Sequence, residues 1–150
     1  MDYKYTSKNE MDTIELAENI ESEKFENMVI CLKGDLGSGK TLFVKGFAKS
    51  LGIQDSITSP SFSLVKEYYS GEMPLFHMDI YRLEKVEDSE IFEEYFYKNG
   101  ITIIEWAEMM QDALPEERLE INIRVVDENT RLIIIKPFGS KYEELCESVL

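Results

Sequence analysis

The chain has 150 residues, a length that fits a single domain able to bury about two-thirds of the surface its unfolded form exposes. Its residues are 43% hydrophobic and 31% charged, which excludes a disordered chain, and no apolar run approaches the ~20 residues of a membrane span. The net charge of −14 repels nucleic-acid backbones and argues against extensive direct contact with them.

The N-terminus and the cysteines indicate the compartment. Residues 1–5 lack the apolar core of a signal peptide, so we expect a cytoplasmic protein without a membrane association. Two cysteines, Cys31 and Cys146, are too few for a disulfide scaffold, and we interpret both as reduced core residues. Together with a single histidine they give no support to a zinc site.

The hydrophobic pattern of the first half predicts a helix, a strand and a second helix. Asn9 is a candidate N-cap for a helix with apolar positions Met11, Ile14, Ala17 and Ile20. The apolar run 28–32 predicts a buried strand, and a glycine-rich segment follows it directly. The second helix carries Leu42, Phe43, Phe47 and Leu51 and is expected to end at Gly52.

The second half is richer in candidate strands, at 62–68, 74–81 and 101–105. An acidic helix between the last two has Ile91, Phe92, Tyr95 and Phe96 on one face. Alternation over 119–125 predicts a half-buried strand that forms a hairpin with 132–136, and a C-terminal helix follows. We therefore expect one α/β domain over 1–150, P-loop NTPase-like, with a mostly parallel central sheet, flanking helices and a C-terminal antiparallel hairpin.

The segment 34–41 fits the phosphate-loop pattern of Gly, four residues, Gly-Lys and Ser or Thr. Gly34 and Gly39 permit backbone conformations that a β-carbon obstructs, so successive amides can point into one anion-binding nest at a helix N-terminus. The amides expected there belong to Leu36, Gly37, Ser38, Gly39, Lys40 and Thr41. Lys40 is expected to reach the β- and γ-phosphates and the Thr41 hydroxyl to bind Mg²⁺.

Such a site also needs an acidic group at the end of a neighbouring strand to organise the metal. Asp79 and Glu105 both follow apolar runs, and either would lie at the carboxyl edge of a sheet. The residues alone leave open which of them acts and which only caps or forms a salt bridge. Trp106 is either a core residue or a lid near the nucleotide, and the lone His77 is interpreted as a packing or surface residue.

Three further segments accompany the phosphate loop in a fixed order. They are Ser59-Pro60-Ser61-Phe62-Ser63-Leu64-Val65, His77-Met78-Asp79-Ile80-Tyr81-Arg82-Leu83 and Ile104-Glu105-Trp106-Ala107-Glu108. With the loop they resemble the TsaE family, bacterial P-loop ATPases of tRNA threonylcarbamoyladenosine biosynthesis, from about Thr13 to the C-terminal helix. The resemblance implies a small α/β P-loop fold and weak, Mg²⁺-dependent hydrolysis of ATP. It also implies a complex with the TsaB and TsaD proteins, which transfer threonylcarbamoyl onto adenosine 37 of ANN-decoding tRNAs.

The resemblance also implies roles for single residues. Glu105 joins Thr41 at the Mg²⁺, and Asp79 lies by the γ-phosphate and its attacking water. Thr13 matches a threonine beside the nucleotide, and Arg131 matches a nucleotide-contacting arginine. A mobile switch segment corresponds to Ser59, Pro60, Ser61, Phe62 and Ser63, where the family often carries threonines at positions 61 and 63. The tRNA is expected to touch this chain only indirectly.

Other classes of function remain open on the residues alone. A small-molecule kinase also uses a P-loop, but it usually carries an arginine-bearing lid, and we find no basic lid segment. A GTPase is disfavoured because neither an Asn-Lys-x-Asp nor an Asp-x-x-Gly motif occurs. A bound nucleotide that serves only as a clamp for a partner interface is the non-enzymatic alternative. The acidic stretch 84–94 is interpreted as a solvated helix face, with a docking surface as its alternative.

Overall fold

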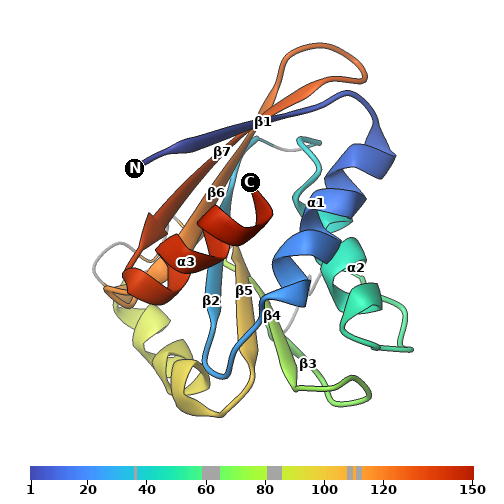
Figure 1. Ribbon diagram of the computed structural model, residues 1–150. Helices are drawn as coiled ribbons and strands as arrows, with labels where there is room; N and C mark the ends of the chain where they lie inside the picture. Colours follow the sequence, from blue (N-terminus) through green and yellow to red (C-terminus); the bar gives the residue numbers. More distant parts are fainter. Residues whose placement is uncertain (36, 59–64, 81–85, 108–109, 111–112) are drawn as a thin grey trace.

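The computed structural model describes residues 1–35, 37–58, 65–80, 86–107, 110 and 113–150. Within them one sheet holds seven strands in the order β1-β7-β6-β2-β5-β4-β3 (Figure 1). The strands are β1 (Tyr3–Ser7), β2 (Val29–Lys33), β3 (Val65–Tyr68), β4 (Leu75–Asp79), β5 (Ile101–Glu105), β6 (Arg118–Val125) and β7 (Arg131–Phe138). The helices are α1 (Glu10–Ser22), α2 (Lys40–Ser50), α3 (Ser140–Val149) and the 3₁₀ helix η1 (Val86–Tyr97).

The centre of the sheet is parallel and its margins are antiparallel. Strands β6, β2, β5 and β4 pair in parallel, whereas β3 pairs antiparallel with β4, and β7 pairs antiparallel with β6 and β1. The α/β class and the C-terminal hairpin predicted from the sequence are confirmed. Because the four parallel strands point the same way, their carboxyl ends meet at one edge, where ligands of open α/β sheets bind.

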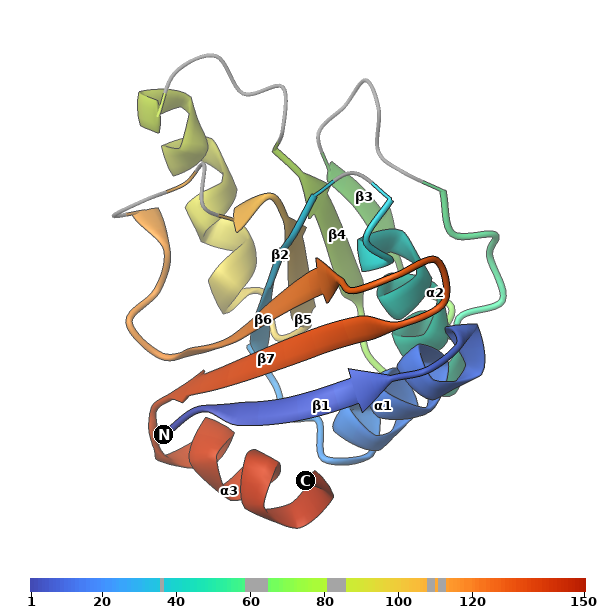
Figure 2. The ribbon, with the colours of Figure 1, turned by 90° about the horizontal axis from the view of Figure 1, so that it is seen from above.

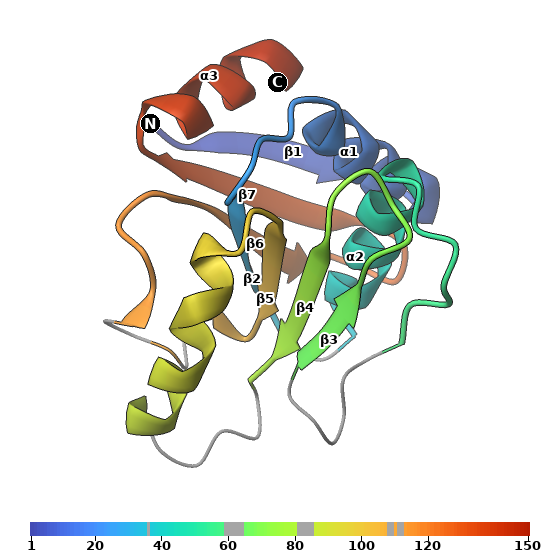
Figure 3. The ribbon, with the colours of Figure 1, turned by 90° about the horizontal axis from the view of Figure 1, so that it is seen from below.

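Helices cover both faces of the central strands. Figure 2 shows α1, α2 and α3 on one side of the sheet, and Figure 3 shows the yellow helix η1 across β2, β5 and β4 from α1 and α2. Strand β2 is therefore buried on both faces: Ile30 and Leu32 join the core beneath α1 and α2, and Val29 and Cys31 join the core beneath η1. A fully buried parallel strand explains the uninterrupted apolar run in its sequence.

Two of the expectations for the N-terminal region need correction. No strand is predicted before the first helix, yet β1 pairs with β7 from Tyr3 opposite Ile135 to Ser7 opposite Arg131. Asn9 caps α1 as predicted, since its side chain accepts a hydrogen bond from the Asp12 amide at 2.9 Å. Met11, however, is 67% exposed, and the buried face of α1 turns toward Leu16, Ala17 and Ile20.

The remaining expectations for the core hold in part: Leu42 and Tyr95 are only half-buried, and the side chain of Ile91 lies outside the described residues. Phe43, Phe47 and Leu51 are buried along α2, and Phe92 and Phe96 are buried on η1. Both cysteines are free and buried, and burial raises the pKa of Cys31 to about 12 and that of Cys146 to about 11. Such thiols stay protonated and unreactive. None of the described helices is long and apolar enough to cross a membrane.

The Tyr142 hydroxyl anchors the first residue of β2. The Val29 amide donates a hydrogen bond to this oxygen over 2.9 Å, and both residues are 2% exposed. We expect Tyr142→Phe to lower the free energy of unfolding by about 1–3 kcal/mol, because the amide is left buried without an acceptor. Urea unfolding measures this. Tyr97→Phe is the control: Tyr97 is 75% exposed, and its change should stay within about 0.5 kcal/mol. Equal effects of the two changes would contradict the anchoring role.

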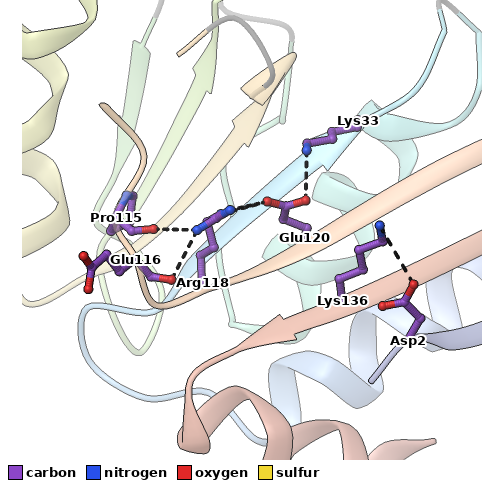
Figure 4. Close-up of polar contacts among 7 residues, drawn as sticks. All are labelled: Asp2, Lys33, Pro115, Glu116, Arg118, Glu120 and Lys136. Atoms are coloured by element: carbon purple, nitrogen blue, oxygen red, sulfur yellow. Dashed lines mark hydrogen bonds and ion pairs between the residues drawn. The ribbon is translucent and has the colours of Figure 1, made fainter. Parts of the chain in front are cut away.

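A partly buried ion cluster joins β2 to β6 (Figure 4). Glu120 accepts hydrogen bonds from Lys33 Nζ at 2.9 Å and from Arg118 Nε at 2.8 Å. Burial alone would raise the pKa of Glu120, but the hydrogen bonds and charges of Lys33 and Arg118 outweigh it and hold that pKa below its ordinary value of 4.5. Because Lys33 immediately precedes Gly34, the cluster also anchors the strand end that leads into the glycine-rich turn.

The lowered pKa predicts a pH dependence of stability. A carboxyl whose pKa is depressed by folding stabilises the folded state above its unfolded pKa, and that contribution is lost as the pH falls through the folded pKa. We expect the stability difference between the wild type and Glu120→Gln to be constant from pH 7 to about pH 5 and to shrink at lower pH. Denaturant unfolding over a pH series measures it. A difference that did not change below pH 4.5 would contradict the ionised cluster.

Candidate functional site

The glycine-rich turn connects the carboxyl end of β2 to the start of α2. A β-carbon on Gly34 would lie 2.5 Å from the backbone oxygen of Ile123, and both Gly34 (φ +146°) and Gly39 (φ +109°) adopt conformations that favour glycine. Gly39 occupies the N-cap of α2, so no side chain caps the first amides of this 11-residue helix. Uncapped amides at the positive end of a helix are suited to bind an anion. Leu36 lies outside the described residues.

Lys40, the first residue of α2, turns back over the loop that precedes it. Its ammonium donates hydrogen bonds to the backbone oxygens of Gly34 at 2.5 Å and Asp35 at 3.0 Å. It also lies 3.9 Å from the ring centroid of Trp106. The side chain is only 4% exposed, so a buried positive charge stands beside the uncapped helix end. Both features favour a negatively charged ligand at this position.

Both candidate carboxylates reach the same sheet edge as the loop. The register of β4 and β5 places Asp79 directly opposite Glu105, and the Thr41 hydroxyl lies 3.3 and 3.4 Å from the two carboxylate oxygens of Glu105. Glu105 is 3% exposed and Asp79 is half-buried. A pocket of about 290 Å³ is lined by Gly37, Gly39, Lys40, Thr41, Leu42, Asp79, Glu105 and Trp106. The structure therefore brings the predicted phosphate-binding and metal-binding residues together.

The donor set on this pocket fits magnesium better than a transition metal. Thr41 and Glu105 offer a hydroxyl and a carboxylate, and oxygen ligands are what Mg²⁺ prefers. The part of the chain that the structure describes contains no group of three or more His, Cys, Asp or Glu side chains able to hold a metal. Mg²⁺ needs no such cage, because it is commonly bound through one or two protein ligands, substrate phosphates and water.

A second pocket of about 400 Å³ lies on the other side of the loop. It is lined by Asn9, Glu10, Thr13, Gly37, Ser38, Gly39, Leu42, Glu128, Asn129 and Arg131. Arg131 donates from Nε to the Ser38 backbone oxygen at 3.0 Å, and the hydroxyls of Thr13 and Ser7 share a hydrogen bond of 2.7 Å. Gly37 and Gly39 line both pockets, so a ligand gripped by the loop can extend from one into the other.

Sequence reasoning missed one contact of the site. His77 is buried as the packing interpretation expects, but its ring also contacts Glu105, which that interpretation does not include. Trp106, offered by the sequence as a core residue or as a lid, lines the pocket that contains Lys40 and Thr41 and takes a left-handed backbone conformation, with φ +62°. Two signals could have linked His77 to the site. One is the period-two pattern of β4, which puts His77 and Asp79 on one face, and the other is the place of His77 in a segment that resembles the family. The switch-like residues 59–63 lie outside the described residues.

The fold and the glycine-rich turn define a P-loop NTPase-like α/β domain. A sequence model of the family described as "Threonylcarbamoyl adenosine biosynthesis protein TsaE" matches residues 7–133. The chain therefore belongs to the TsaE family.

Individual relatives agree with this assignment. The tRNA threonylcarbamoyladenosine biosynthesis protein TsaE of Bacillus subtilis is 45% identical over 121 residues, which are 81% of this chain and 77% of that protein. The TsaE protein of Aquifex aeolicus is 41% identical over 128 residues, covering 84% and 90%. The crystal structure of Bacillus subtilis YdiB matches with a TM-score of 0.83 and 38% identity, over 99% of this chain and 94% of that one.

Proposed function

We propose that this chain is the Mg²⁺-dependent, ATP-binding and weakly hydrolysing subunit of the assembly that forms N6-threonylcarbamoyladenosine at position 37 of ANN-decoding tRNAs. Family membership supports the biosynthetic role. The observation that carries the ATPase role is the placement of Lys40 and Thr41 at the start of α2, facing Glu105 and Asp79 across one pocket. TsaB and TsaD are the proposed partners, and the cytoplasm, which holds the tRNA, is the proposed compartment.

Phosphate binding follows from the loop. The uncapped amides of α2 and the ammonium of Lys40 attract the phosphate tail of ATP. Lys40 must exchange its contacts with the backbone oxygens of Gly34 and Asp35 for phosphate oxygens, which are better acceptors for an ammonium because they are charged. We assign the nucleoside to the second pocket, beside Thr13 and Arg131.

Hydrolysis needs positioning and charge neutralisation more than covalent chemistry. Thr41 and Glu105 would hold Mg²⁺, which when bound neutralises charge on the phosphates. Asp79, opposite Glu105 in the register, would orient the attacking water. The half-buried position of Asp79 also supports low activity of the chain alone, because this wall of the pocket stays accessible to solvent until a partner covers it.

The test is ATP turnover by the chain alone and with TsaB and TsaD. We expect slow release of free phosphate alone and a clear increase in the assembly. Equal turnover in both conditions would contradict the need for a partner. A phosphorylated small-molecule product in place of free phosphate would indicate a kinase and overturn the ATPase assignment.

A further inference from the structure

The only histidine of the chain is completely buried against the acidic residue of the proposed metal site. His77 on β4 is 0% exposed, and its Nε2 lies 2.5 Å from Glu105 Oε2 on the neighbouring strand β5. Glu105 in turn contacts the Thr41 hydroxyl. Three side chains from β4, β5 and α2 therefore form a continuous chain of polar contacts between the core and the pocket.

The two ring nitrogens of His77 have different surroundings. Within the described residues Nε2 contacts the carboxylate, whereas the buried Nδ1 has no hydrogen-bond partner. Where the Glu105 carboxylate accepts this hydrogen bond, the hydrogen of the ring lies on Nε2. The unsatisfied Nδ1 costs free energy of folding that an apolar residue at this position would avoid. Packing alone therefore does not explain a histidine here. The contact with Glu105 is the feature that a leucine could not reproduce.

A hydrogen bond at this place fixes the direction of a flexible side chain. Glu105 has several rotatable bonds and is 3% exposed, so solvent contributes little to its orientation. With Oε2 held against His77, both carboxylate oxygens lie beside Thr41, 3.3 and 3.4 Å from its hydroxyl, and Oε1 forms no hydrogen bond with the histidine. Residues that orient the ligands of a metal in this way commonly change metal affinity when replaced.

We infer that His77 is a positioning residue for the metal site: it donates Nε2–H to Glu105 and holds the carboxylate toward Thr41 and the pocket. The inference rests on the proposed function, because it assigns His77 a task at the Mg²⁺ that Glu105 is proposed to bind. His77 itself does not line the pocket, so the inference assigns it no direct contact with the nucleotide or the metal.

The test is the affinity for the nonhydrolysable analogue AMPPNP, measured with Mg²⁺ and again with EDTA, together with a Mg²⁺ titration at saturating AMPPNP. His77→Leu is expected to weaken Mg²⁺ binding by about 10- to 100-fold while AMPPNP affinity in EDTA is unchanged. His77→Gln, which keeps an amide donor near the position of Nε2, should restore part of the Mg²⁺ affinity. Met78→Leu, a change of similar volume in the next buried residue of β4, should leave it unchanged.

The possible outcomes separate the two proposals. Wild-type Mg²⁺ affinity in a folded His77→Leu overturns the positioning role and leaves the proposed function intact. An equal loss of AMPPNP affinity with Mg²⁺ and with EDTA also overturns it, because such a loss indicates a purely structural role. If wild-type AMPPNP binding does not depend on Mg²⁺, the proposed metal site fails, and the role of His77 fails with it.

A second measurement needs no variant. The nitrogen resonances of a single histidine can be assigned without ambiguity in a ¹⁵N-labelled sample of the whole chain. We expect a ring with hydrogen on Nε2 and none on Nδ1, and a change in the Nε2–H signal when Mg²⁺ is added to the AMPPNP-bound protein. A ring with its hydrogen on Nδ1 alone would overturn the proposal.

Discussion

Lys40→Ala is expected to reduce ATP hydrolysis by the assembly with TsaB and TsaD by at least about 100-fold, with a marked loss of ATP affinity. The change removes the one ammonium that stands at the uncapped start of α2 among the described residues of the pocket. Removing a single preorganised donor from the charge that develops in a transition state commonly costs 10²- to 10³-fold. Phosphate release and calorimetric titration with Mg²⁺–ATP measure the two effects.

Lys45→Ala is the matched control for this change. Lys45 lies on the same helix, carries the same charge and is exposed to solvent. Replacing Lys45 by alanine changes the net charge by the same amount but removes no contact with the glycine-rich turn. ATP hydrolysis and ATP affinity should therefore stay close to those of the wild type. Because the Lys40 ammonium also bonds the backbone of Gly34 and Asp35, unfolding curves of both variants should accompany the comparison. Wild-type ATP affinity in a folded Lys40→Ala would contradict phosphate binding by this side chain.

Glu105→Gln is expected to lower Mg²⁺-dependent hydrolysis by about 10²- to 10³-fold, a loss of the size seen when one electrostatic contact to the transition state is removed. The amide keeps the shape of the side chain but removes the charge that would hold Mg²⁺ beside Thr41. Nucleotide binding in EDTA should change little, because the loop amides and Lys40 remain. Hydrolysis and binding with and without Mg²⁺ measure these effects.

Glu94→Gln serves as the comparison, since the Glu94 side chain is 67% exposed and pairs only with the exposed Lys98 among the described residues. It should leave hydrolysis unchanged. If Glu105→Gln hydrolysed ATP at the wild-type rate, the metal-binding role of Glu105 would be wrong. If Glu105→Gln lost hydrolysis but still supported the function of the partner proteins, bound nucleotide would stabilise the partner interface and its hydrolysis would not be required.

Those parts of the fold that depend on local sequence were predictable. The buried run of β2, the glycine-rich turn and the amphipathic α2 lie next to one another in the chain, and each has a pattern of its own. The strand β1 has no comparable signal, because only Tyr3 and Tyr5 alternate within five residues, and its stability comes from pairing with β7 more than 120 residues away. A single sequence contains no direct information on such a partner.

The same limit applies to the site. Thr13 and Arg131 were assigned by resemblance, and it is the arrangement of α1 and β7 around the loop that puts them on one pocket. The contact between His77 and Glu105 depends on β4 lying beside β5, which no local pattern reveals. Met11 shows a further limit: helical spacing includes it in an apolar stripe, but whether the end of that stripe is covered depends on the neighbouring elements.

The central claim is that the turn between β2 and α2 grips the phosphate tail of ATP. Its most direct test is calorimetric titration of Mg²⁺–ATP into the chain with TsaB and TsaD present, at two temperatures so that a vanishing enthalpy at one of them cannot hide binding. We predict saturable heat with one ATP bound per chain, and its loss in Lys40→Ala. The absence of heat at both temperatures would contradict the claim.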